Sequence, residues 1–167
     1  MTFPRVDFKD GLVYHDYHFN GMQYEIAKEI KQKDLINYYD LRLINSDYQY
    51  SFIEPAVDKS RCDTALTSAH FDTNGMVITT SELGVVQDWY SVSFTPPAPT
   101  VEFYLYADVE KPADTDVVFE VGDGTSYTVL VLEQPLSLAV ATIKLRIGLT
   151  ASSVDKPRVY NYCLMWR

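Results

Sequence analysis

Short runs of alternating apolar and polar residues between Val101 and Trp166 restrict the fold of this chain more than any other feature. In VEFYLYADV, residues 101–109, the apolar side chains fall on one face of an extended strand, and Glu, Tyr and Asp side chains fall on the other. Residues 116–121 and 143–150 alternate in the same way, and turn residues separate the runs. Because no segment of helical period lies between them, parallel β-α-β units are excluded. The pattern predicts antiparallel sheets.

The turn residues predict how these strands follow one another. A Gly-Asp-Gly turn at 122–124 lets the chain reverse, so residues 116–121 and 126–133 are expected to form a hairpin. The runs at 143–150 and 158–166 are expected to form a second strand pair, separated by a Ser-rich loop.

Two further strands are expected upstream, at 74–80 and 84–94, the second of them closed by a cluster of prolines that cannot donate ladder hydrogen bonds. The strands then number about seven beyond residue 65, which is typical of sandwiches and jelly rolls. The sequence therefore predicts an all-β protein, an antiparallel two-sheet sandwich (jelly roll), over residues 61–167.

The first 60 residues form an aromatic-rich arm that holds seven of the 13 tyrosines. Residues 11–21 and 47–55 resemble strands with aromatic faces, while 28–39 fits a short helix or an irregular crossing. The arm either completes one of the sheets or packs on a partner chain, since Tyr is enriched at interfaces. The interface candidates in this arm are Tyr14, Tyr17, Phe19, Tyr38 and Tyr39.

Composition and charge exclude several classes of protein. The chain has 14 basic and 23 acidic residues, a formal net charge of −9, which is the wrong sign for binding a nucleic acid backbone. The first 25 residues lack the apolar run of a signal peptide or a membrane span, and we expect no membrane insertion. Two cysteines are too few for a disulfide scaffold. Cys62 and Cys163 are expected to be buried free thiols, and a single bridge between them is the alternative.

The search for catalytic or metal-binding residues gives no specific constellation. On a strand, His15 and His18 would point to opposite faces and could not share a metal ion. A Cys62 nucleophile with His70 as its base lacks a recognisable orienting group. The acidic residues between 101 and 123 fit solvated strand ends and loops better than a calcium site. We therefore expect no enzyme activity, no cofactor and no metal site.

Aromatic side chains alternate with the apolar set on two strands, on a face that a small sandwich would leave polar. Tyr104 and Tyr106 do so on one strand, and Tyr160, Tyr162 and Trp166 on another. The N-terminal arm, another subunit or a stacked sugar ring could cover them, or both faces are buried within the chain. The candidates for contact with a glycan or a partner are Trp89, Tyr104, Tyr106, Tyr160 and Tyr162.

A family pattern extends over residues 100–167. Its pieces are a strand ending in Ala-Asp-Val, an Asp-Thr-Asp loop, an Asp-Gly-Thr turn followed by Tyr127, a Leu-Arg-Ile-Gly-Leu-Thr strand, and a closing Pro-Arg-Val-Tyr-Asn-Tyr. In this order they resemble the carbohydrate-binding-like jelly-roll modules of tail, baseplate and fibre proteins of tailed bacteriophages. The aromatic position after the turn is a packing residue on this view, with Tyr127, Val129 and Val131 facing inward.

The resemblance implies a non-enzymatic structural protein of a bacteriophage virion, a small tail, baseplate or fibre subunit that acts through protein–protein contacts. A glycan-binding module for host-surface recognition and a capsid decoration or head-fibre protein are the alternatives. The implied partners are other virion proteins, either in a homo-oligomer, with a trimer favoured, or in a mixed complex. Such a protein would be made in the host cytoplasm and reside in the virion.

Overall fold

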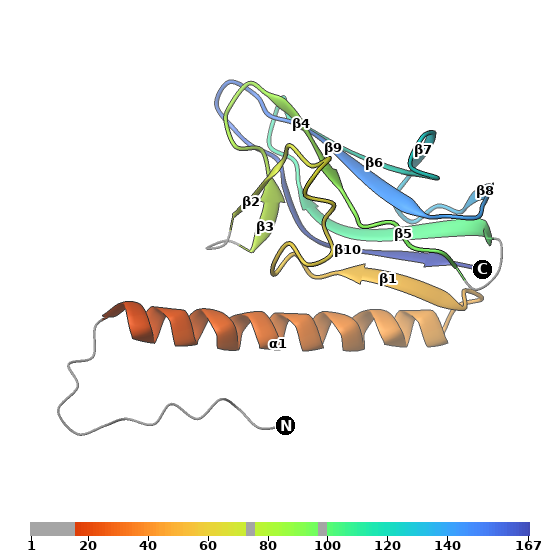
Figure 1. Cartoon of the computed structure of the whole chain (residues 1–167), viewed down its shortest axis with the longest axis horizontal. Helices are drawn as coiled ribbons and strands as arrows, with labels where there is room; N and C mark the ends of the chain where they lie inside the picture. The colour runs from red at the N-terminus through yellow and green to blue at the C-terminus, as the bar shows by residue number, and fades with distance from the viewer. Residues whose placement is uncertain (1–15, 73–75, 97–99) are drawn as a thin grey trace.

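Two antiparallel sheets stack face to face in the computed structural model, which describes residues 16–72, 76–96 and 100–167 (Figure 1). The elements, in chain order, are α1 (Asp16–Ile44), β1 (Tyr50–Glu54), β2 (His70–Asp72), β3 (Val77–Thr79), β4 (Val86–Tyr90), β5 (Thr100–Glu110), β6 (Asp116–Gly122), β7 (Tyr127–Leu130), β8 (Leu136–Val140), β9 (Lys144–Thr150) and β10 (Arg158–Trp166). One sheet has the order β2-β3-β10-β5-β8, with β1 also paired to β10, and the other has the order β4-β9-β6-β7. The predicted all-β two-sheet sandwich is confirmed.

The core between the sheets is built from the alternating apolar residues. Phe103 and Leu105 of β5 face Leu145, Ile147 and Leu149 of β9 across the sandwich, and all five are fully buried. Full burial of one such side chain stabilises the fold by about 2 kcal/mol. The predicted inward set of 116–121 is also confirmed, because every second residue of β6 joins the same core.

The helix α1 covers the outer face of the larger sheet along β1, β10 and β5 (Figure 1). The Tyr24 hydroxyl donates a hydrogen bond of 3.1 Å to the Val57 carbonyl, and Lys28 forms an ion pair of 2.8 Å with Asp58. Toward the other end of the helix, Tyr39 packs beneath the sheet at 3% exposure. These contacts are distributed over the helix, so α1 forms a third layer on the sandwich.

The expectation of a strand at 11–21 is wrong for residues 16–21, which belong to α1, while residues 11–15 lie outside the described part of the chain. Gly21 is helical even though a glycine inside a helix costs about 1 kcal/mol relative to Ala. Packing of the helix on the sheet outweighs this local preference. The short helix expected at 28–39 is the middle of a helix of 29 residues. The strand expected at 47–55 is confirmed as β1, which pairs with β10.

Strand β10 differs from the prediction in the direction that its side chains face and in the strands with which it pairs. A bulge between Val159 and Asn161 shifts its alternation, so Tyr162 and Trp166 face the sandwich core instead of the outer surface. The predicted pair of 143–150 with 158–166 is wrong, because β9 pairs with β4 and β6 while β10 lies in the other sheet.

The predicted hairpin of β6 and β7 is confirmed, but the facing of its second strand is not. Leu130 is the buried residue of β7, at 3% exposure, while Val129 and Val131 are each 52% exposed. Tyr127 lies on the outer side, where its ring contacts Tyr90 edge to face at 6.1 Å. The turn therefore sets the register one residue away from the predicted one.

Among the described residues, no helix combines the length and apolar content needed for a transmembrane span.

Candidate functional site

A groove of about 380 Å³ runs between the C-terminal half of α1 and the edge of β5, and we call it the aromatic groove. Its main lining residues are Tyr38, Tyr39, Arg42, Tyr106, Asp108 and Glu133. The helix positions the first three through its four-residue periodicity, and β5 positions the next two through its alternation. Four residues singled out in the sequence, Tyr38, Tyr39, Tyr104 and Tyr106, lie in or beside it.

Arg42 organises the aromatic residues of the groove. Its guanidinium carbon lies 4.7 Å from the centre of the Tyr38 ring and 4.3 Å from that of Tyr106, and the guanidinium donates a hydrogen bond to the Tyr38 hydroxyl. Contacts of this kind between a cation and a ring face are attractive. The Arg42 Nε atom is buried and has no hydrogen-bond partner in the described part of the chain.

The floor of the groove is a buried hydrogen bond between helix and sheet. The Tyr39 hydroxyl donates to Asn161 Oδ1 of β10 at 2.6 Å, and both side chains are buried. Burial raises the pKa of Tyr39 well above its usual value, so the phenol stays protonated at neutral pH. This contact joins α1 to β10 at the base of the groove.

The opposite wall of the groove carries two carboxylates. Asp108 and Glu133 are both exposed, and neither forms an ion pair among the described residues. Glu133 has a positive φ of 58°, a conformation that residues other than glycine adopt infrequently. Ring faces next to carboxylate and guanidinium groups could hold a polyhydroxylated ring, because the rings stack on its C–H faces and the charged groups bond its hydroxyls.

The other aromatic candidates lie elsewhere. Trp89 and Tyr162 are fully buried in the sandwich core, so neither ring has a free face, and their choice as ligand-stacking residues is wrong. Tyr160 lies outside the groove and donates a 2.7 Å hydrogen bond to Glu110. Tyr14 lies outside the described residues, and Tyr17 and Phe19 belong to α1 without described side chains.

Sequence reasoning missed Arg42, Glu133 and Asn161. Arg42 follows Tyr38 by four residues, a spacing that places both on one helix face, but this signal required the helix to be recognised first. Asn161 reaches the groove only because of the bulge in β10. No local pattern marks Glu133.

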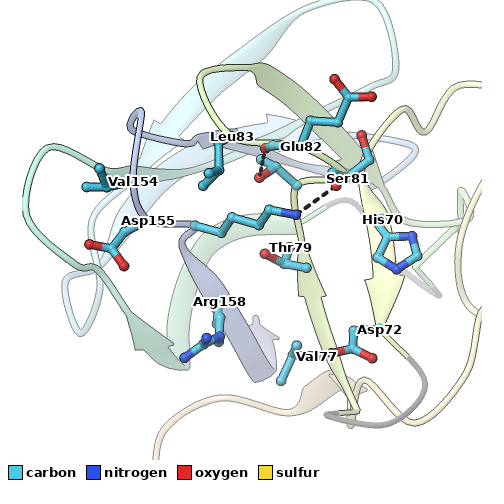
Figure 2. A pocket seen from close by; sticks show the side chains of 12 residues that line it. His70, Asp72, Val77, Thr79, Ser81, Glu82, Leu83, Val154, Asp155 and Arg158 are labelled. Atoms are coloured by element: carbon cyan, nitrogen blue, oxygen red, sulfur yellow. Dashed lines mark hydrogen bonds between the residues drawn. The ribbon is translucent and has the colours of Figure 1, made fainter.

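A second concavity, of about 780 Å³, lies at the β2–β3 end of the sandwich, and most of the side chains that line it are polar (Figure 2). Lys156 and Ser81 both line it, and the Lys156 ammonium donates a 2.7 Å hydrogen bond to the Ser81 carbonyl. Thr79 donates to the Pro157 carbonyl at 2.7 Å, and Arg158 forms an ion pair of 2.8 Å with Glu110. These contacts join the loops at residues 81 and 156–157 to each other and to the ends of β3, β5 and β10. His70 stands exposed at one side of the concavity (Figure 2).

The two cysteines are free and buried, as expected. Burial raises the pKa of the Cys62 thiol, whose Sγ lies 3.2 Å from the Thr67 hydroxyl oxygen, and it raises the pKa of Cys163 to about 12. A raised pKa disfavours the thiolate that nucleophilic catalysis needs. Over the described ranges, no three His, Cys, Asp or Glu side chains are grouped so that they could hold a metal ion.

Comparisons with known proteins give likenesses among solved structures alone. No family model and no curated protein matches the chain. A solved structure described as TmCBM61 in complex with β-1,4-galactotriose is similar over 75% of this chain and 94% of that chain, with 10% sequence identity and a TM-score of 0.37. At so low a TM-score, the likeness bears on neither the ligand nor the function of this chain.

Proposed function

We propose that the chain is a non-enzymatic structural subunit of a bacteriophage virion, an accessory or adaptor protein of the tail, baseplate or fibre that acts through protein–protein contacts. The observation that carries the proposal is the second apolar face of α1. One face of the helix packs on the sheet, while Ile26, Ile30, Leu41 and Ile44 on the opposite face are each at least 50% exposed. Apolar side chains gathered on one exposed face are typical of a protein-contact surface.

Two further features support a contact function. The strands β5, β6, β7, β9 and β10 cover the segment that resembles phage tail and fibre modules. The edge strand β7 and the residue that follows it add two exposed valines, Val129 and Val131, over an apolar groove of about 320 Å³. A subunit that docks on neighbours through such surfaces needs no catalytic group.

The test is the composition of the particle made by the genome that encodes this chain. Density-gradient-purified particles are analysed by mass spectrometry and by gold-labelled antibody in the electron microscope. We expect the chain at a fixed copy number and the gold at one position on the tail. A chain that is abundant in the lysate but missing from purified particles contradicts the proposal.

Substitutions on the exposed face of α1 test whether this face is the contact surface in the particle. Ile30→Glu with Leu41→Glu places two charges on the exposed face and is expected to reduce incorporation into particles at least tenfold. Val86→Glu is the matched control, because Val86 is 72% exposed on β4 and lies away from the helix. Equal incorporation of both variants would exclude the α1 face as the contact surface.

A second candidate function is glycan binding in the aromatic groove, which the arrangement of Tyr38, Tyr106 and Arg42 beside two carboxylates favours. A glycan array followed by titration calorimetry tests it. Tyr106→Ala should lower the affinity for a glycan that binds in the groove by about tenfold. Tyr160→Ala is the control, because that ring lies outside the groove. An array without any bound glycan contradicts this candidate.

A further inference from the structure

Glu54, the last residue of β1, is the one acidic side chain among the described residues that the fold buries, at 2% exposure. It lies directly opposite Tyr162 of β10 in the register of the two strands, so both side chains are on the core face. Its Oε1 atom accepts a 2.9 Å hydrogen bond from the Ala56 amide. Its Oε2 atom is buried and has no hydrogen-bond partner in the described ranges, and the same is true of the Tyr162 hydroxyl.

The hydrogen bond to Ala56 closes a turn with unusual backbone geometry. Ala56 has a φ of 47°, in the left-handed region that residues other than glycine seldom adopt. Such a conformation persists only where the surrounding contacts impose it. Ala56 and Val57 are both buried, so the turn is part of the core. The Glu54 carboxyl therefore helps to hold residues 55–58 in a conformation that the backbone alone does not favour.

The same turn anchors the N-terminal half of α1. The Val57 carbonyl accepts the 3.1 Å hydrogen bond from the Tyr24 hydroxyl, and Asp58 forms the 2.8 Å ion pair with Lys28. The C-terminal half of the helix is held elsewhere, through the hydrogen bond of Tyr39 to β10. Opening of the turn would therefore take two partners from the first half of α1 and leave this contact of the second half in place.

Neither of the two cations near Glu54 forms an ion pair with it. The titratable or charged groups that face the carboxyl come from its own segment, from α1 and from β10, and they are Asp58, Arg61, Cys62, Lys31 and Tyr162. The Arg61 guanidinium donates a hydrogen bond to the Ile53 carbonyl. The Lys31 ammonium donates to the carbonyls of Met76 and Tyr160, at 2.8 and 3.0 Å. Burial therefore dominates and raises the pKa of Glu54 from 4.5 to about 7.

We propose that Glu54 is a proton-operated latch for the N-terminal half of α1. With the carboxyl neutral, the side chain stays in the core, the turn at 55–58 keeps its shape, and Tyr24 and Lys28 keep their partners. When the proton leaves, the carboxylate moves out to water, because a buried charge without a partner is unfavourable. The turn then opens, and the helix segment that carries Tyr24 and Lys28 separates from the sheet while Tyr39 stays bound. The latch does not depend on the proposed virion function.

The latch has a defined direction with pH. The pKa of Glu54 is about 7 in the closed form and should return to its ordinary 4.5 in the open form, where water solvates the carboxylate. The ratio of open to closed molecules should therefore rise about tenfold per pH unit between these two values and change little above the higher one. The whole rise is about 300-fold, so the latch is closed in acid and opens toward neutral pH.

The test measures the distance between α1 and the second sheet with a pair of spin labels on the full chain. One label is attached at Glu29→Cys, next to Lys28, and the other at Val86→Cys on β4, and both positions are exposed. The native thiols are buried and stay unlabelled when the labels are attached at about pH 6. Double electron–electron resonance should give one distance at about pH 5 and a second, longer one at about pH 8.

Three comparisons isolate Glu54 and the first half of the helix. Glu54→Gln keeps the size of the side chain and carries no charge, so it should keep the single short distance at both pH values. Glu110→Gln removes a carboxyl that is hydrogen-bonded to Arg158 outside the core, and it should behave as the parent does. Labels at Asn37→Cys and Val86→Cys report the C-terminal half of α1 and should give one distance throughout.

Three results would overturn the latch. They are a distance from residue 29 that is the same at about pH 5 and about pH 8, the same lengthening in Glu54→Gln as in the parent, and an equal lengthening from residue 37, which would mean that the whole helix leaves the sheet. Carbon NMR of the Glu54 carboxyl tests the coupling without the Gln variant, in case that variant does not fold. Its resonance should shift over the pH range in which the longer distance appears, and a carboxyl that titrates while the distance stays constant also overturns the proposal.

Discussion

The hydroxyl of Tyr39 on α1 donates a 2.6 Å hydrogen bond to the Asn161 side chain on β10, and this buried contact joins the helix to the sandwich. Tyr39→Phe removes the hydroxyl and leaves the Asn161 oxygen without its partner. A buried acceptor that loses its partner costs about 1 to 3 kcal/mol. Chemical denaturation of the full chain should report a loss of that size. Tyr38→Phe is the control and should change stability little, since Tyr38 is 48% exposed.

Glu54 predicts how stability depends on pH. Burial raises its pKa from 4.5 to about 7, although its Oε1 accepts a 2.9 Å hydrogen bond from the Ala56 amide. Between these two values the folded protein holds the proton more tightly than the unfolded chain, so stability should fall as pH rises through this window. Glu54→Gln removes the fall, and at about pH 8 it should be more stable than the parent by about 3 kcal/mol.

The comparison variant for this pH series is Glu110→Gln. Hydrogen bonds from Tyr160 and Arg158 lower the pKa of Glu110, so its carboxylate stabilises the folded state and the variant should gain nothing at high pH. Unfolding measured at several pH values from about 4 to about 8 separates the two residues. Parallel pH curves for the parent and Glu54→Gln would contradict a protonated, buried Glu54.

Gly122 predicts a strong steric effect at the β6–β7 hairpin. A Cβ at this position would lie 1.7 Å from the Ser126 carbonyl oxygen, a backbone atom that cannot move aside without opening the turn. Gly122→Ala should therefore destabilise the fold by about 2 kcal/mol or more. Gly148→Ala serves as the matched strand control, because the nearest atom to its Cβ, Asp88 Oδ1, is at 3.6 Å. Thermal melts of both variants give the comparison.

The two thiols should be inert in the folded protein. Cys62 and Cys163 are buried, and burial raises both pKa values, so iodoacetamide at about pH 8 should label neither until denaturant is added. Cys163 lies beneath α1, whereas Cys62 belongs to the core between the sheets. Tyr39→Phe should therefore speed labelling of Cys163 and leave Cys62 unchanged. Rapid labelling of Cys163 in the parent would mean that the helix does not stay on the sheet.

The alternation of residue types on β5 correctly predicted which of its side chains face the core, because the two sides of that strand have different neighbours. Phe103 and Leu105 meet the second sheet, while Tyr104 and Tyr106 meet α1. The helix itself was ambiguous, because Met22, Ile26 and Ile30 fit a helix and a strand equally well. Only contacts with residues distant in sequence, such as Asn161, decide between them.

The remaining errors have local physical causes. The bulge near Val159 reverses the facing of Tyr162, and a one-residue change of register is not visible in a pattern of period two. Similarly, a Ser-rich loop gives no sign of whether it returns to the same sheet or crosses to the other. The aromatic groove could be predicted only in part, since Tyr106 was identified while Arg42 and Glu133 depend on the helix and on loop geometry.

Strand β10 lies between β5 on one side and β1 and β3 on the other. The ribosome makes α1 before any strand and β10 after all the others described here. The side chains on which the helix settles, Asn161, Cys163 and Met165, thus emerge about 120 residues later than Tyr39. During translation α1 therefore leaves the exit tunnel with both of its apolar faces bare, and we expect a nascent-chain chaperone to protect it until the sheet closes.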